Sequence, residues 1–123
     1  FLVSPGSTPP LLDAMDATGL PHLPGVATVS EVLALLARGQ TQMKFFPAQA
    51  SGGVAFLKST ASPLPAARFC PTGGISADNA ADYLALPNVG CVGGSWITPN
   101  HLLQAGDWEG VTALARAAAE LAR

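Results

Sequence analysis

The stretch that decides the fold is Gln42-Met43-Lys44-Phe45-Phe46-Pro47, in which a single lysine stands among apolar residues and a proline ends the run. Such a run predicts a buried strand over 42–46. The residues that follow, from about Gly53 to Thr60, have the pattern of a helix. A strand followed directly by a helix is the unit of a parallel sheet, and the same unit recurs on both sides of this one.

Two such units come before it. The run 1–3 leads through turn residues to a helix near 10–17, with Thr8 as a candidate N-cap. A second short strand near 22–26 comes before Thr28-Val29-Ser30-Glu31, which has the spacing of a capping box at the start of a helix. Both units therefore predict further strands of one parallel sheet.

Two more units come after it. The run 68–70 leads to a helix that Ser76 caps and that reaches Leu86. The run 89–92 is followed by a short turn and by a last helix, which Asp107 caps. The apolar face of that helix consists of Val111, Leu114, Ala115, Ala118 and Leu121. The chain thus contains five predicted βα units.

Five parallel strands fit either an open sheet or a barrel. The glycine fingerprint of a dinucleotide-binding sheet follows none of the five strands, which favours the barrel. A barrel of eight strands needs about 200 residues or more, whereas this chain has 123. We therefore expect an α/β fold in which residues 1–123 form a single domain, the last five βα units of a TIM-type (β/α)8 barrel. Because Phe1 opens directly into an apolar run, we expect that the N-terminal part of the barrel is missing.

Composition argues against several classes of protein. The net charge is -2 without a basic stripe, so neither nucleic acid nor an anionic membrane is an expected partner. No apolar run approaches the roughly 18 residues of a membrane span, and the N-terminus lacks the charged region of a signal peptide, so we expect a cytoplasmic protein. The two cysteines, Cys70 and Cys91, are not spaced as a metal site or a disulfide scaffold. We therefore expect two reduced thiols and no metal.

The chain contains only two lysines, and they occupy different settings. Lys58 lies on a predicted helix, where a solvated lysine is the ordinary case. Lys44 lies inside a strand and shares its side with Gln42 and Phe46, because residues two apart on a strand face the same way. Desolvation of an ammonium group favours the neutral amine, which can attack a carbonyl carbon and form a Schiff base. The alternative, a lysine that points outwards or pairs with a carboxylate, stays open, although the nearby strands contain no carboxylate.

Paired glycines follow the last two predicted strands, as Gly73-Gly74 and as Gly93-Gly94-Ser95. Successive glycines let backbone N–H groups approach an anion closely. In β/α barrels the common phosphate site follows strands seven and eight, which are the last two strands here. Either pair alone is a weak signal, because turns use glycine regardless of ligands. Together they predict a phosphate site.

No general base for the Schiff-base chemistry of Lys44 is evident in the sequence. Aldol cleavage needs a group that accepts the proton of the substrate hydroxyl and a group that protonates the enamine. All carboxylates fall on predicted helices or at helix starts, and a structural role is expected for both His22 and His101. The carboxylates are Asp13, Asp16, Glu31, Asp78, Asp82, Asp107, Glu109 and Glu120. The chain therefore lacks part of the expected catalytic site.

Three segments closely resemble the 2-keto-3-deoxy-6-phosphogluconate (KDPG) aldolase family. They are Met43-Lys44-Phe45-Phe46-Pro47-Ala48, Phe69-Cys70-Pro71-Thr72-Gly73-Gly74-Ile75 and Gly93-Gly94-Ser95-Trp96. Ser4-Pro5-Gly6, and Pro24-Gly25 with the capping box, are also similar to that family. The resemblance covers essentially the whole chain, in order and at the right spacing.

The resemblance implies a homotrimeric barrel enzyme without metal or other cofactor that cleaves KDPG to pyruvate and glyceraldehyde 3-phosphate in the Entner-Doudoroff pathway. Many members also cleave 4-hydroxy-2-oxoglutarate. Lys44 matches the Schiff-base lysine, Thr72 a substrate contact, and Phe46 and Pro5 positions that line the pocket. The implied phosphate loop is Gly73, Gly74, Gly94 and Ser95. The family's catalytic glutamate and a substrate-binding arginine come from earlier strands and have no match here, and Gln49 stands where the family usually has glutamate.

Two alternatives remain at the level of sequence. One is another phosphate-binding barrel enzyme, such as a thiamin phosphate synthase, in which the glycine loops bind phosphate and Lys44 is not a nucleophile. The other is a non-catalytic phosphate-binding fragment that pairs its open sheet edges with another copy of the chain.

Overall fold

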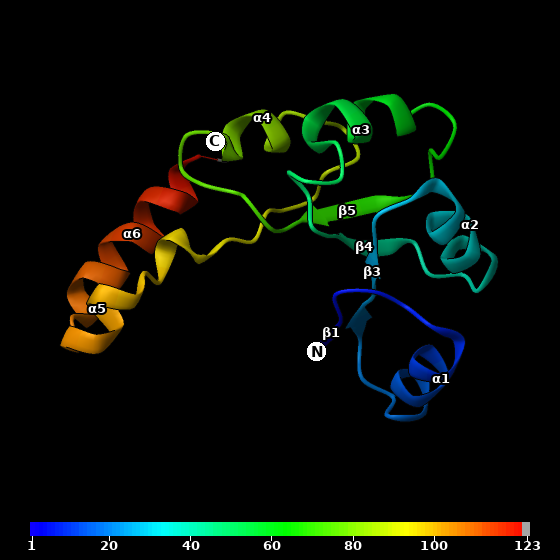
Figure 1. Cartoon of the computed structure of the whole chain (residues 1–123), viewed down its shortest axis with the longest axis horizontal. Coiled ribbons are helices and arrows are strands. Elements are labelled where there is room, and N and C mark those ends of the chain that lie inside the picture. The colour runs from blue at the N-terminus through cyan, green and yellow to red at the C-terminus, as the bar shows by residue number, and fades with distance from the viewer. Residues whose placement is uncertain (122–123) are drawn as a thin grey trace.

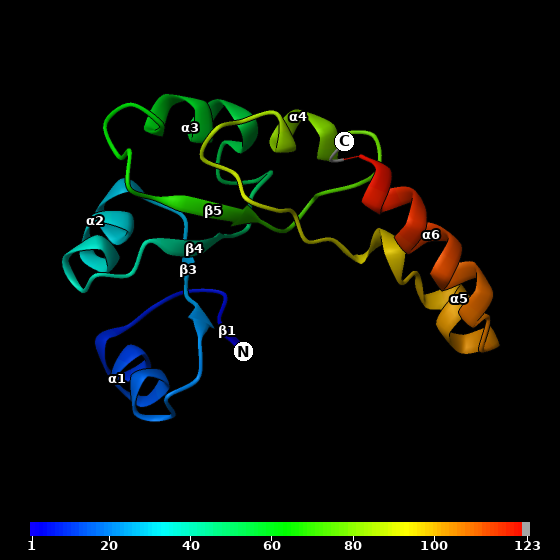
Figure 2. The same cartoon turned by 180° about the vertical axis from the view of Figure 1, so that it is seen from behind.

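The computed structural model describes residues 1–121, which form parallel strands alternating with helices. The elements are β1 (Leu2–Val3), α1 (Pro9–Ala17), β2 (His22–Leu23), β3 (Gly25–Val26), α2 (Val29–Ala37), β4 (Gln42–Phe45), α3 (Gly53–Thr60), β5 (Arg68–Pro71), α4 (Ala80–Leu84), the 3-10 helix η1 (Ser95–Ile97), α5 (Asn100–Ala105) and α6 (Trp108–Glu120). Helices α3 and α4 lie along one face of β4 and β5, while α5 and α6 form an arm that extends away from them (Figures 1 and 2). No helix within residues 1–121 is long and apolar enough to cross a membrane.

The strands pair in parallel as two short sheets, β1-β2 and β3-β4-β5. The single strand predicted over 22–26 is divided at Pro24, because a proline has no N–H to donate to a neighbouring strand. The path nevertheless continues across the division, since the Lys44 N–H donates to the Pro24 carbonyl at 2.9 Å. The α/β fold with parallel strands is therefore as predicted, but one strand lies in two sheets.

The prediction of a strand over 89–92 was wrong, because this segment pairs with β5 and the residue after it only through two isolated bridges. The bridges pair Phe69 with Val89 and Thr72 with Gly93. The three residue steps from Phe69 to Thr72 therefore face the four steps from Val89 to Gly93. One extra residue breaks the regular alternation of ladder hydrogen bonds, as a bulge does. The segment follows β5 without forming a continuous strand.

The core lies between the sheet and helices α2, α3 and α4. Met43 and Phe45 of β4 are fully buried, and the Phe45 ring stacks on that of Phe56 in α3, with 4.9 Å between ring centroids and 8° between planes. Phe69 of β5 meets Phe45 edge to face at 6.3 Å. Burying side chains of this size contributes about 1.5–3 kcal/mol each. Because alternate residues of β4 face these helices, the residues between them face the other side of the sheet.

Of the N-caps of α1, α2 and α6, two make the predicted capping hydrogen bonds and the third does not. The capping box of α2 is present: Thr28 Oγ1 accepts from the Glu31 N–H at 3.3 Å, and Glu31 Oε2 accepts from the Thr28 N–H at 2.8 Å. Asp107 caps α6 by accepting from the Gly110 N–H at 2.8 Å. Thr8 precedes α1 as predicted but accepts no capping bond. Prolines at the first two helical positions have no N–H to donate there.

Two predictions about the later helices need correction. Helix α4 begins at Ala80, after Asn79, and ends at Leu84, whereas Ser76 was predicted to cap a helix that reaches Leu86. The reason is that Asn79 organises the preceding turn: its Oδ1 accepts from the Ser76 N–H at 2.9 Å and its Nδ2 donates to the Gly74 carbonyl at 2.9 Å. On α6, Ala115 is exposed, whereas the other four residues of the predicted apolar face are half-buried.

Candidate active site

A cavity of about 600 Å³ opens on the face of β4 and β5 opposite the helices. Its lining residues are Phe1, Val3, Pro21, His22, Leu23, Gln42, Lys44, Cys70, Thr72 and Cys91. Of the predicted site residues, Lys44 and Thr72 line this cavity. No aspartate or glutamate is among the described residues that line it, so Lys44 has no carboxylate partner in the cavity.

Lys44 is the cationic group of the cavity. It is half-buried in the middle of β4, where its register neighbours are Gly25 of β3 and Cys70 of β5. Its Nζ lies 4.4 Å from the centroid of the Phe46 ring, which is the geometry of a cation–π contact. The predicted sharing of one side by Lys44 and Phe46 is therefore confirmed. When neutral, this amine can attack a carbonyl carbon of a molecule bound in the cavity, and the ring can stabilise the cationic iminium that results.

Pro5 lies apart from the cavity. It is exposed and is not a lining residue. Its backbone instead lies against β3, since an added Cβ at Gly25 would lie 2.2 Å from the Pro5 carbonyl carbon. A side chain at position 25 is therefore excluded by the turn after β1. Pro5 thus supports the strand next to Lys44 in the described structure.

Two cavity residues, Cys70 and Cys91, were not predicted as site residues. Cys70 lies beside Lys44 in the register of the two strands. Its pKa is raised to about 12, mainly because the thiol is buried. A hydrogen bond and a charge interaction with Cys91 raise this pKa further, while the charge of Lys44 lowers it. Cys70 is therefore a neutral thiol at neutral pH, and Lys44 is the nucleophilic candidate. Cys70 stands two residues before Thr72, as Lys44 stands two residues before Phe46. Residues two apart on a strand face the same side, so the predicted substrate contact of Thr72 could have indicated that Cys70 also faces the site.

Thr72 follows β5 and offers an unused polar group. Its Oγ1 is buried and has no hydrogen-bond partner within the described part of the chain. Buried hydroxyls are normally hydrogen-bonded, and an unpaired one is costly. Because Thr72 also lines the cavity, a polar group of a bound molecule is a suitable partner for this hydroxyl.

The paired glycines lie at the carboxyl ends of neighbouring segments. Gly73 and Gly74 have φ values of +91° and +77°, which favour glycine, and an added Cβ at Gly73 would lie 3.1 Å from the Phe46 ring. The bridge between Thr72 and Gly93 brings the second glycine pair beside the first. Gly94 is extended, with φ of −164°, and Ser95 is exposed as the first residue of η1. The structure thus brings both glycine loops to one end of the sheet.

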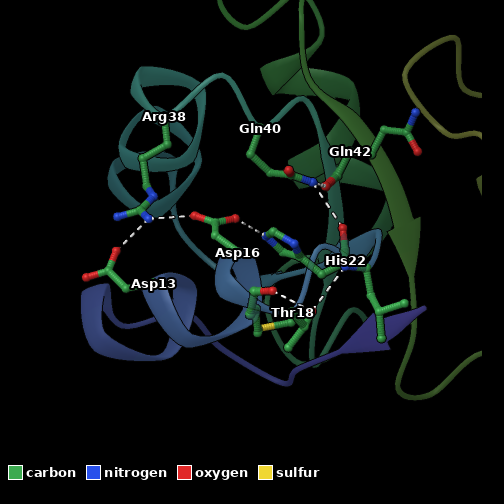
Figure 3. Close-up of polar contacts among 9 residues, drawn as sticks. Asp13, Asp16, Thr18, His22, Arg38, Gln40 and Gln42 are labelled. Carbon is green, nitrogen blue, oxygen red and sulfur yellow. Dashed lines mark hydrogen bonds and ion pairs between the residues drawn. The ribbon is translucent and has the colours of Figure 1, made fainter.

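His22 belongs to a polar network at the other end of the strands (Figure 3). Its Nε2 lies 3.6 Å from Asp16 Oδ1, and Arg38 Nη2 donates to Asp16 at 2.9 Å and to Asp13 at 2.7 Å. Gln40 Nε2 donates to the backbone carbonyls of His22, at 3.2 Å, and of Gln42, at 2.7 Å. The network joins α1, β2 and the end of α2, and His22 also lines the cavity of Lys44. Within residues 1–121 no three potential metal ligands cluster.

The chain is similar to known proteins of one family. The family model described as KDPG and KHG aldolase matches residues 1–114. The KHG/KDPG aldolase of Escherichia coli (strain K12) is 50% identical over 123 residues, which are 100% of this chain and 58% of that protein. The KDPG aldolase of Legionella pneumophila, crystallised with pyruvate captured as a covalent carbinolamine, has a TM-score of 0.91 and 46% identity and covers 94% of this chain and 56% of its own.

A second solved structure is similar. The KDPG aldolase of Zymomonas mobilis ZM4, crystallised with 3-phosphoglycerate, has a TM-score of 0.87 and 46% identity and covers 96% of this chain and 55% of its own. These comparisons do not favour a thiamin phosphate synthase. The chain spans a little over half the length of the relatives it matches, for example 58% of the E. coli protein. The chain belongs to the family of KDPG and KHG aldolases.

Proposed function

We propose that the protein containing this chain is a class I aldolase in which Lys44 forms a Schiff base with a keto acid. The observation that carries the proposal is the place of Lys44, whose amine lies over Phe46 in a cavity without a lining carboxylate among the described residues. The carbinolamine of pyruvate in the L. pneumophila relative supports it. The proposed reaction is cleavage of KDPG to pyruvate and glyceraldehyde 3-phosphate, with 4-hydroxy-2-oxoglutarate as a second substrate.

The chemistry follows from an amine in this position. The neutral Lys44 amine adds to the keto carbon, and the carbinolamine loses water to give an iminium. The iminium accepts the electron pair of the breaking carbon–carbon bond, while the hydroxyl that becomes the aldehyde loses its proton to a base. Protonation of the resulting enamine and hydrolysis then release pyruvate and restore the amine. The described residues that line the cavity include no carboxylate, so the proposal assigns the role of the base to none of them.

The other predicted site residues have roles in this proposal that follow from their places. Thr72 offers its unpaired hydroxyl to the keto acid end of the substrate, and Phe46 holds the cationic nitrogen. The phosphate group lies at the two glycine loops, whose successive backbone N–H groups can approach an anion closely. The residues assigned to phosphate are Gly73, Gly74, Gly94 and Ser95. The 3-phosphoglycerate of the Z. mobilis relative supports a phosphorylated substrate.

The finer features of the fold and assembly belong to the same proposal. We assign residues 1–123 to a single domain that supplies about the last five βα units of a (β/α)8 barrel, with the bridged segment 89–93 in the place of the fifth strand. The parallel pairing of β3, β4 and β5 and the TM-score of 0.91 over 56% of the L. pneumophila chain support this assignment. We also propose a cytoplasmic homotrimer that works without metal or cofactor. The trimer is tested by the molar mass of the full-length protein in light scattering.

Borohydride trapping tests the central claim. Reduction of the full-length protein in the presence of pyruvate should attach a stable three-carbon adduct to Lys44, as read by peptide mass spectrometry. Lys58→Arg is the matched control, because Lys58 is exposed on α3, and this variant should retain the adduct. Lys44→Arg should abolish it. An adduct on Lys58, or no adduct on either lysine, would overturn the proposed function.

A further inference from the structure

The loops that follow β4 and β5 are hydrogen-bonded to each other beyond the ends of the strands. The Ala48 N–H donates to the Thr72 carbonyl at 2.8 Å, and the Gln49 N–H donates to the Gly73 carbonyl at 3.1 Å. The loop after Lys44 therefore continues the parallel pairing with the loop of paired glycines. The position of one loop depends directly on that of the other.

The Gln49 side chain extends this connection into the core. An added Cβ at Gly74 would lie 2.6 Å from Gln49 Cβ, so Gln49 lies directly against the glycine loop. Its Oε1 accepts a hydrogen bond from the Tyr83 hydroxyl at 2.9 Å. Tyr83 is 1% exposed and belongs to the core cluster, on helix α4. Gln49 thus joins the loop to a fixed point in the core.

The bond between Gln49, which is exposed, and the buried Tyr83 lies close to the start of α3. An added Cβ at Gly53, the first residue of α3, would lie 3.1 Å from the Tyr83 hydroxyl and 3.6 Å from Gln49 Oε1. Asn79 Nδ2 also donates to the Gly74 carbonyl at 2.9 Å. Burial raises the pKa of Tyr83, so its hydroxyl remains a donor throughout the neutral range. Neither Gln49 nor Tyr83 lines the cavity of Lys44.

We propose that Gln49 and Tyr83 are positioning residues that hold the Gly73-Gly74 loop at a fixed distance from Lys44 and thereby set the preference for phosphorylated keto acids. The inference rests on the proposed function. A phosphorylated substrate is held at both ends, by the Schiff base and by the glycine loop, so its binding depends on the distance between them. An unphosphorylated keto acid is bound without the glycine loop and is insensitive to that distance.

The two substrates give the test an internal control. In the full-length protein, Tyr83→Phe should raise KM for KDPG about three- to tenfold, the effect of one lost hydrogen bond, while kcat changes little. The kinetic constants for 4-hydroxy-2-oxoglutarate should change less than about twofold. The reason is that the bond between Tyr83 and Gln49 affects substrate binding only through the glycine loop, which this substrate does not use. Gln49→Leu should reproduce this result. Gln49→Glu keeps an acceptor for the Tyr83 hydroxyl, so this variant should keep the wild-type ratio of the two KM values.

Thr60→Val is the matched control, because it also removes a buried hydroxyl, which donates to the Leu57 carbonyl at 3.0 Å near the end of α3. It should leave the ratio unchanged. Equal effects on the two substrates in Tyr83→Phe, or an unchanged KM for KDPG in both loop variants, would overturn the inference while the wild-type activity stands. A wild-type protein that forms no Schiff base with pyruvate would overturn the proposed function and this inference with it.

Discussion

Phe46 lies between Lys44 and the glycine loop: its ring centroid is 4.4 Å from the Lys44 ammonium nitrogen, and its edge would be 3.1 Å from an added Cβ at Gly73. One aromatic ring thus contacts both parts of the proposed site. It is held there because residues two apart on a strand project to the same side, away from the helices that cover Phe45.

Replacement of Phe46 tests the contact with the cation. Phe46→Leu should lower the amount of Schiff base trapped at a given pyruvate concentration about two- to thirtyfold, because a cation over a ring gains about 0.5–2 kcal/mol and the iminium is a cation. The measurement is borohydride trapping followed by intact mass spectrometry. Phe56→Leu is the control, since its ring stacks on Phe45 on the helix side. The Phe56→Leu protein should be less stable but should trap as much Schiff base as the wild type. Equal losses of trapped Schiff base in Phe46→Leu and Phe56→Leu would contradict the role of Phe46 in holding the cation.

Gly73 should tolerate no side chain. Its φ is +91°, and an added Cβ would meet the Phe46 ring at 3.1 Å and Pro47 Cα at 3.2 Å. Gly73→Ala should therefore lower the free energy of unfolding by about 1–3 kcal/mol, as measured in urea. Gly90→Ala is the control, because nothing lies within 4 Å of an added Cβ at this exposed glycine. A Gly73→Ala protein as stable as Gly90→Ala would disprove the argument.

Sequence alone located features that depend on neighbours along the chain. The bounds of α3, the capping box of α2 and the side of β4 on which Lys44 projects all follow from local spacing, and all are observed. The start of α4 was missed because Asn79 bonds back to Gly74 and holds the turn, a competition that helix propensity does not express.

Features that depend on register between distant segments were not predictable in this way. The break of the 89–92 strand needs the one-residue mismatch against β5. Cys70 beside Lys44 needs the pairing of β4 with β5, and the bond from Tyr83 to Gln49 joins residues 34 apart in the chain. Periodicity assigns a face to each residue, but it does not say which residues of two elements meet.

Glu31 should make stability depend on acidic pH. Its pKa is lowered from 4.5, first by the hydrogen bond from the Ala27 N–H and also by bonds from Thr28, against the opposing effect of burial. The native carboxylate thus holds its proton less tightly than the unfolded one, so its contribution is present above pH 4.5 and is lost as the pH falls through the lowered pKa. Glu31→Gln should reduce this acid loss, measured by urea unfolding across this range. Glu109→Gln, in the first turn of α6, should not.

Cys70 should make stability depend on alkaline pH in the opposite sense. Its pKa is raised from 9.0 to about 12 in the folded chain, so the unfolded thiol ionises first. The stabilisation is complete below pH 9.0 and is lost as the pH rises towards 12. The free energy of unfolding, measured at intervals across this range, should fall in the wild-type protein and fall less in Cys70→Ser.

Cys91→Ser separates the causes of this shift. Burial of Cys70 is the largest cause and the contact with Cys91 is secondary, so Cys91→Ser should keep most of the alkaline loss that Cys70→Ser removes. The order of the two variants is the critical result. If Cys91→Ser removed as much of the alkaline loss as Cys70→Ser, the pairing of the thiols would dominate over burial. Burial on the cavity wall beside Lys44 would then not be the main reason why the Cys70 thiol stays neutral.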